Sequence, residues 1–85
     1  IVMATFLLVL TSYYMCDLAA SETLLSRDDA IFCASLYVEV KSHFGDGETG
    51  AAAYLAFKTW EAENAATVLE LRADAAQRLR KTTSY

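Results

Sequence analysis

Two cysteines, Cys16 and Cys33, are the residues of this sequence best placed for covalent chemistry. If two antiparallel helices turn near residues 24–26, each cysteine lies eight or nine residues from the turn. The two cysteines then lie at the same height along the neighbouring helices. A bond also requires that their Cβ atoms point toward each other. Two buried free thiols are the alternative, which we prefer because unbonded cysteines are common in apolar cores. Neither cysteine belongs to a CxxC, CxxCH or Cys/His zinc pattern.

The single histidine, His43, lies four residues after Glu39, so that both side chains could face one metal ion or share a proton. Metal sites in helical bundles draw several such ligands from different helices, whereas this chain offers one pair. From Ala51 onward the acidic residues are Glu61, Glu63, Glu70 and Asp74. Their spacing predicts a solvated face and not the close pairing that acid–base catalysis needs. We therefore expect no catalytic residue, no metal ligand and no cofactor, and a protein that is not an enzyme.

Residues 45–50, Gly-Asp-Gly-Glu-Thr-Gly, combine glycine and carboxylates as some ion-binding and phosphate-binding loops do. The segment has neither the length and ligand order of an EF-hand nor the spacing of a P-loop. Gly45 can adopt the left-handed conformation that ends a helix, and Asp46 or Thr49 can cap the next helix. The pattern predicts a tight antiparallel hairpin that turns between Gly45 and Gly50.

Long runs of good helix formers without proline predict an all-α protein with a single small domain, residues 1–85. We expect three helices, at about residues 1–25, 27–44 and 48–80, and a frayed tail at 81–85. Ser26 can cap the second helix, where Asp28 and Asp29 suit the positive end of the helix dipole. The third helix is predicted to be continuous because no breaker interrupts it.

The first stretch, from Ile1 to Ala20, has no charged residue before Asp17 and is apolar around its whole circumference. Such a helix is buried by protein on all sides or inserted in lipid. Its length is borderline for spanning a bilayer, and Tyr13 and Tyr14 would suit an interfacial aromatic belt. Both alternatives stay open, and with them the location of the protein, at a membrane or soluble within a complex.

Hydrophobic residues make up 55% of the 85 residues, which is more than a small domain can hide from water. The surplus predicts a non-catalytic structural or interaction subunit of a helical homo-oligomer, or of a larger complex with protein partners or a membrane. The net charge of −4 disfavours nucleic acid as a partner. The alternative function is a small helical module that binds an apolar ligand or a lipid in an aromatic-lined pocket.

Candidate residues for such an interface or pocket follow from their size and helical spacing. Aromatic and large apolar side chains supply contact area, and alanines let another helix approach closely. The candidates are Phe6, Leu10, Tyr37, Tyr54, Phe57, Trp60, Ala62, Ala66 and Leu69. The pocket would be lined by Tyr37, Tyr54, Phe57 and Trp60. The alanines at 62 and 66 would mark a close contact between the third helix and another helix.

Overall fold

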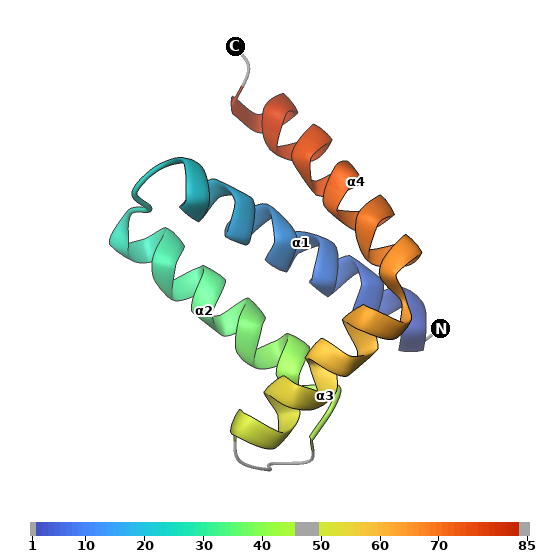
Figure 1. Ribbon diagram of the computed structural model, residues 1–85. Helices are drawn as coiled ribbons and strands as arrows, with labels where there is room; N and C mark the ends of the chain where they lie inside the picture. Colours follow the sequence, from blue (N-terminus) through green and yellow to red (C-terminus); the bar gives the residue numbers. More distant parts are fainter. Residues whose placement is uncertain (1, 46–49, 84–85) are drawn as a thin grey trace.

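The computed structural model describes residues 2–45 and 50–83, with side chains described for residues 5–45 and 51–81. The helices in these ranges are α1 (Val2–Glu22), α2 (Arg27–Ser42), α3 (Gly50–Glu63) and α4 (Ala65–Thr83), as Figure 1 shows. The all-α prediction is confirmed, because no strand occurs in the described part of the chain. The prediction of three helices is wrong, since the segment expected to form the third helix contains both α3 and α4.

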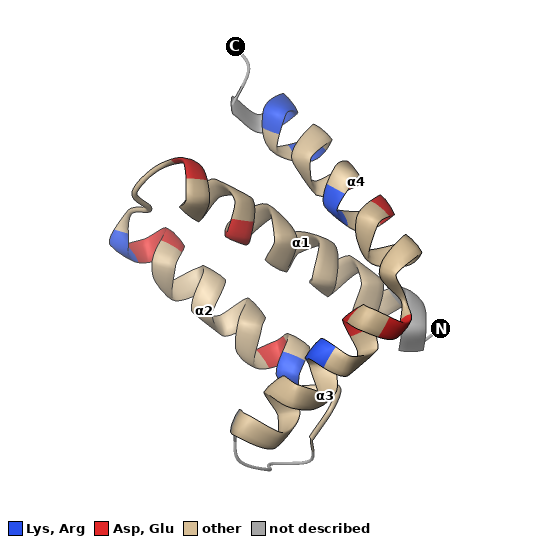
Figure 2. Ribbon diagram, viewed as in Figure 1, with Lys and Arg blue, Asp and Glu red and all other residues tan. Residues whose placement is uncertain are grey.

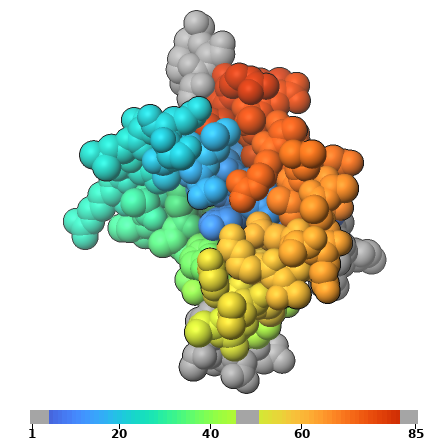
Figure 3. Space-filling view, in the orientation of Figure 1, coloured from blue at the N-terminus to red at the C-terminus, as the bar shows by residue number. Residues whose placement is uncertain are grey.

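α1 lies at the centre of the fold, between α2 and α4, while α3 crosses its N-terminal half (Figure 1). α2 runs antiparallel to α1, and α4 runs in roughly the same direction as α1. The space-filling view shows α1 framed by the three other helices (Figure 3). Phe6, Leu10 and Tyr14 of α1 are at most 4% exposed. No helix within the described ranges is long and apolar enough to cross a bilayer.

α1 ends at Glu22, earlier than the predicted end near residue 25, because the chain turns back here to pack α2 against it. The Thr23 amide donates the last helical hydrogen bond, 3.0 Å long, to the Ala19 carbonyl. Ser26 then caps α2 as predicted, since its hydroxyl accepts a 3.2 Å hydrogen bond from the Asp29 amide. This cap satisfies one of the backbone amides that the first turn of a helix leaves unpaired.

The predicted continuous helix at 48–80 is interrupted at Asn64, where the chain bends sharply (Figure 1). The side-chain amide and the backbone amide of Asn64 both donate to the Trp60 carbonyl, each at 2.9 Å. A polar side chain that enters the hydrogen-bond ladder in this way kinks a helix. A straight helix over 48–80 would be about 50 Å long, and the long axis of the molecule is 41 Å. The bend lets α3 cross α1 and lets α4 lie along it.

The predicted hairpin turn falls mainly on residues 46–49, which lie outside the described residues. α2 ends at Ser42, two residues before the predicted end. Beyond it, the Phe44 ring packs on α3, with its centroid 5.7 Å from that of Phe57 and 6.4 Å from that of Trp60. At the other end of the chain α4 continues to Thr83, and so includes the first residues of the predicted tail.

The core combines side chains from all four helices. Its buried members are Phe6, Leu10, Tyr14, Val40, Phe57 and Ala75. The Phe6 ring meets two other aromatic rings edge-on, with centroid distances of 5.2 Å to Trp60 and 5.6 Å to Phe44. Edge-to-face pairs at these distances are favourable beyond the area that they bury. Aromatic side chains therefore hold α3 to α1.

Candidate functional site

Polar side chains from three helices meet at one carboxylate, that of Glu61 on α3. The Tyr14 hydroxyl of α1 donates to Glu61 Oε2 at 2.5 Å, and the Lys58 ammonium donates to Oε1 at 3.0 Å. The Arg72 guanidinium of α4 lies 3.9 Å from Glu61 Oε2 and 4.2 Å from the centre of the Tyr14 ring. Arg72 also donates to Asp17 Oδ2 of α1 at 3.4 Å. We call these five residues the Glu61 junction.

Burial and hydrogen bonding govern protonation at the Glu61 junction. Tyr14 is 1% exposed, and the Glu61 side chain is 12% exposed. Burial, followed by the hydrogen bond and the negative charge of Glu61, raises the pKa of Tyr14 well above its usual value. The hydrogen bond to Glu61 also raises the pKa of Lys58. The Tyr14 hydroxyl therefore keeps its proton and donates it in the hydrogen bond to Glu61, which links α1 to α3.

The position of Glu61 shows that the prediction of a solvated carboxylate face on the third helix is wrong at this residue. This side of α3 faces α1, because Glu61 accepts from Tyr14 and the neighbouring Trp60 packs on Phe6. The sequence does contain the signal, because Glu61 follows the buried Phe57 by four residues and so lies on the same helix face. Glu63 and Glu70 are exposed, as the prediction has them.

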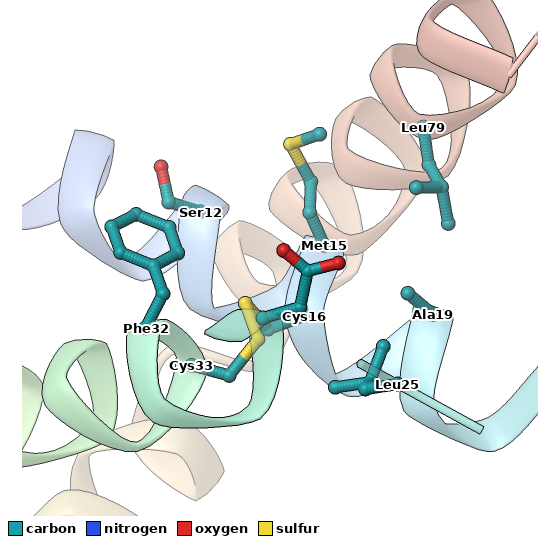
Figure 4. Close-up of a pocket in the computed structure, with 9 residues that line it drawn as sticks. Ser12, Met15, Cys16, Ala19, Leu25, Phe32, Cys33 and Leu79 are labelled. Atoms are coloured by element: carbon teal, nitrogen blue, oxygen red, sulfur yellow. A yellow bond between two sulfur atoms is a disulfide. The ribbon is translucent and has the colours of Figure 1, made fainter. Parts of the chain in front are cut away.

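A pocket of about 260 Å³ lies between α1, α2 and α4. It is lined by Ser12, Met15, Cys16, Ala19, Leu25, Asp29, Phe32, Cys33 and Leu79. Figure 4 shows Phe32 of α2 and Leu79 of α4 on opposite sides, with Met15 of α1 between them. Most of the lining is apolar, and Asp29 contributes its one carboxylate. We call this feature the α1–α2–α4 pocket.

A disulfide between Cys16 and Cys33 forms part of the wall of the α1–α2–α4 pocket. The two Cα atoms are 5.7 Å apart, within the usual range for a disulfide. The structure therefore contains the disulfide, and the preferred prediction of two free thiols is wrong. Antiparallel packing of α1 and α2 makes the two cysteines level, and their side chains point toward each other (Figure 4).

The nine residues predicted to form an interface or a pocket are divided between the core and the surface. Phe6, Leu10 and Phe57 are core residues, and Trp60 packs against the Phe6 ring. Tyr37 stacks on Tyr13 of α1, with ring centroids 5.5 Å apart. The members at the surface are Tyr54, Ala62, Ala66 and Leu69. Phe57 and Trp60 share Phe44 as a neighbour, and Tyr37 and Phe57 share Tyr13, so these three candidates pack into the core, whereas Tyr54 is exposed.

The alanine contact differs from the expected one. Ala62 and Ala66 are exposed, so they make no close contact between helices within the chain. Ala53 of α3 and Ala75 of α4, which are 5% and 1% exposed, face the core instead. The reason is the bend at Asn64, which gives α3 and α4 separate orientations. The prediction treats residues 48–80 as one straight helix, so it assigns one buried face to both.

His43, which belongs to the Glu39/His43 pair at which we expect no metal ion, lies at the edge of the aromatic cluster. The His43 ring lies 4.7 Å from the Phe6 ring, centroid to centroid. Glu39, one turn earlier, is exposed. In the described part of the chain, no group of three His, Cys, Asp or Glu residues is arranged to hold a metal ion.

The outer face of α2 carries apolar side chains that no other described helix covers. Ile31 and Val38 are 57% and 62% exposed, seven residues apart, on the side opposite to Val40. We call this face the α2 strip; it consists of Ile31, Ala34, Ser35, Val38 and Ser42. The α2 strip is absent from the candidates derived from sequence, although its helical spacing is visible there.

Comparison of the whole chain with protein-family models, curated proteins and solved structures finds no match.

Proposed function

We propose that this chain is a non-catalytic structural subunit that associates with a second copy of itself through the α2 strip. The observation that carries the proposal is the exposure of Ile31 and Val38, at 57% and 62%, on one helix face. Apolar patches that stay in water cost free energy, and on small proteins they commonly mark sites of association. Association would bury the surplus of apolar residues that the composition predicts.

The polar members of the α2 strip are compatible with burial. The Ser35 hydroxyl donates to the Phe32 carbonyl, and the Ser42 hydroxyl donates to the Glu39 carbonyl, both at 2.6 Å. Both hydroxyl donors would therefore enter an interface already paired, which avoids the penalty of a buried unsatisfied donor. Ala34 and Ser35 are also small, so a second helix can approach closely between Ile31 and Val38.

Charge is compatible with self-association at this face. The chain carries a net charge of −4, so most contacts between two copies would bring like charges together. Figure 2 shows the middle of α2 without Lys, Arg, Asp or Glu, and its charged residues near the helix ends. The α2 strip itself contains no charged residue. Two copies can therefore meet there with the flanking carboxylates of Asp28 and Glu39 at the margin of the contact and not at its centre.

The test is the mass of the protein in solution, measured by analytical ultracentrifugation with and without mild detergent. Wild type should sediment above the 9.4 kDa of one chain in detergent-free buffer. Val38→Asp should sediment as a single chain, because a carboxylate in a closed apolar interface is costly. Leu69→Asp is the matched control, because Leu69 is 71% exposed on α4 and should leave association intact. Wild type at one chain's mass would contradict the proposal.

Two further parts of the proposal concern the chain itself. We propose that residues 45–50 form the tight hairpin turn between α2 and α3, and the packing of Phe44 on α3 supports this. The two helices meet at a steep angle and are not antiparallel as predicted (Figure 1). Insertion of residues 1–20 into a membrane has less support, because Phe6 and Leu10 already serve as core residues. A mass that changes only on adding detergent would favour the membrane over the second copy.

Binding of a small apolar ligand is a second candidate, and the α1–α2–α4 pocket is the observation that favours it. Its volume of about 260 Å³ lies just below the usual range for ligand sites, which begins at about 300 Å³. Titration with a neutral solvatochromic dye tests this candidate. Ala19→Phe, which fills the pocket, should abolish dye binding, while Ala66→Phe on the exposed face of α4 should leave it unchanged. Equal binding by both variants would contradict a site in this pocket.

A further inference from the structure

α2 is packed unevenly along its length. Its second half supplies the fully buried Val40 and the half-buried Tyr37, whose ring stacks on Tyr13 of α1 at 5.5 Å. In its first half, every residue from Arg27 to Phe32 is exposed. Side-chain packing therefore holds the second half of α2 to α1 and contributes little to holding the first.

The segment formed by residues 23–33 is attached to the fold mainly by its disulfide. Within it only Leu25 and Cys33 are not exposed, and Leu24 is 97% exposed. The Ser26 cap on the Asp29 amide lies within the segment itself, so it stabilises the helix start without joining it to α1. At its start the segment is joined to α1 by the backbone and by the hydrogen bond from the Thr23 amide to the Ala19 carbonyl. At its far end the bond from Cys33 to Cys16 is the covalent cross-link to α1.

The same segment forms one side of the α1–α2–α4 pocket. The α2 side of the lining consists of Leu25, Asp29, Phe32 and Cys33, and all four belong to residues 23–33. The opposite sides come from α1 and from Leu79 of α4. The shape of the pocket therefore depends on what holds residues 23–33 in place.

We propose that the Cys16–Cys33 disulfide is a redox-sensitive clasp. While it is intact, it holds residues 23–33 against α1 and completes the α1–α2–α4 pocket. When it is reduced, this segment moves away from α1, the second half of α2 stays packed, and Met15 and Ala19 become accessible to solvent. Segments with few buried contacts are the ones that open locally below the free energy of global unfolding. The inference is independent of self-association.

The reduction is a thiol–disulfide exchange with a dithiol. A thiolate of the dithiol attacks one sulfur, the Sγ–Sγ bond breaks, and a mixed disulfide forms with the second cysteine released as a thiolate that takes up a proton. The second thiol of the reductant then displaces the remaining cysteine. Two electrons and two protons pass to Cys16 and Cys33, and the reductant leaves as its own cyclic disulfide.

Hydrogen exchange measured by mass spectrometry on the full chain tests the clasp, with the protein oxidised and after treatment with dithiothreitol. Amides of residues 27–33 should exchange at least about tenfold faster after reduction. Amides around Val40 and in α4 should keep their rates. The emission of Trp60, the only tryptophan, should not shift, because Trp60 packs against the aromatic core and does not line the α1–α2–α4 pocket.

Unchanged exchange in residues 27–33 after complete reduction would overturn the proposal. Faster exchange throughout the chain with a red shift of Trp60 would also overturn it, since the disulfide would then hold the whole fold together. The double variant Cys16→Ser/Cys33→Ser should match the reduced wild type and ignore dithiothreitol. If this variant does not fold, the wild type reduced in place still decides the question. Repeating the comparison in Val38→Asp removes any protection caused by self-association.

Discussion

The Glu61 junction makes a quantitative prediction for Tyr14→Phe. The substitution keeps the ring, which is 1% exposed, but removes the hydroxyl that donates to Glu61 Oε2. Hydrogen bonds to charged groups contribute about 1.5–3 kcal/mol to stability. Glu61 is 12% exposed and keeps Lys58 as a partner, so solvent and the remaining ion pair compensate in part. We therefore expect the free energy of unfolding to fall by about 1.5 kcal/mol, at the lower end of that range.

Thermal unfolding followed by circular dichroism measures this loss. For a domain of this size 1 kcal/mol shifts Tm by roughly 4–8 °C, so the Tm of Tyr14→Phe should fall by about 6–12 °C. Tyr13→Phe is the matched control, because the neighbouring hydroxyl makes no hydrogen bond to any described residue. It should change stability by no more than about 0.5 kcal/mol.

A double-mutant cycle with Glu61→Ala separates the hydrogen bond from other effects of losing the hydroxyl. If the bond stabilises the fold, Tyr14→Phe should cost much less in the Glu61→Ala background than in wild type. Equal losses in both backgrounds would refute the reasoning, because the hydroxyl would then act through something other than Glu61. Equal losses for Tyr14→Phe and Tyr13→Phe would refute it as well.

Two other predictions concern packing and pH. In urea unfolding, Ala75→Leu should destabilise the protein by about 1–3 kcal/mol, because the site is 1% exposed and has no room for a larger side chain. Ala66→Leu on the exposed face should change the free energy of unfolding by no more than about 0.5 kcal/mol. Equal effects would contradict the orientation of α4. Burial and Glu61 raise the pKa of Tyr14, so above about pH 10 the folded state keeps a proton that the unfolded state loses. The contribution of Tyr14 to stability should therefore be full below about pH 10 and should fall as the pH rises above it. Urea unfolding between pH 8 and 11 should show a shallower fall in Tyr14→Phe, and identical slopes would contradict the assignment.

Local signals in the sequence were sufficient for several features. The Ser26 cap, the all-α class and the level placement of Cys16 and Cys33 follow from residue type and spacing over one or two helical turns. The bend at Asn64 was not predicted, because asparagine is only mildly unfavourable within a helix. It bends the chain here because its amide shares the Trp60 carbonyl with the backbone.

By itself the sequence determined that the chain is helical, where α2 begins and that its cysteines could meet. Only the tertiary structure decided which faces are buried. α1 is apolar on every side, so its periodicity does not indicate which of its faces packs against which helix. In the structure α2 and α4 lie on its two sides. The orientation of α3 and α4 depends on the bend between them. In this arrangement Ala75 is buried, Glu61 is partly buried and Ala66 is exposed to solvent. Helical periodicity records the phase of one straight helix, whereas burial depends on how several helices are oriented together.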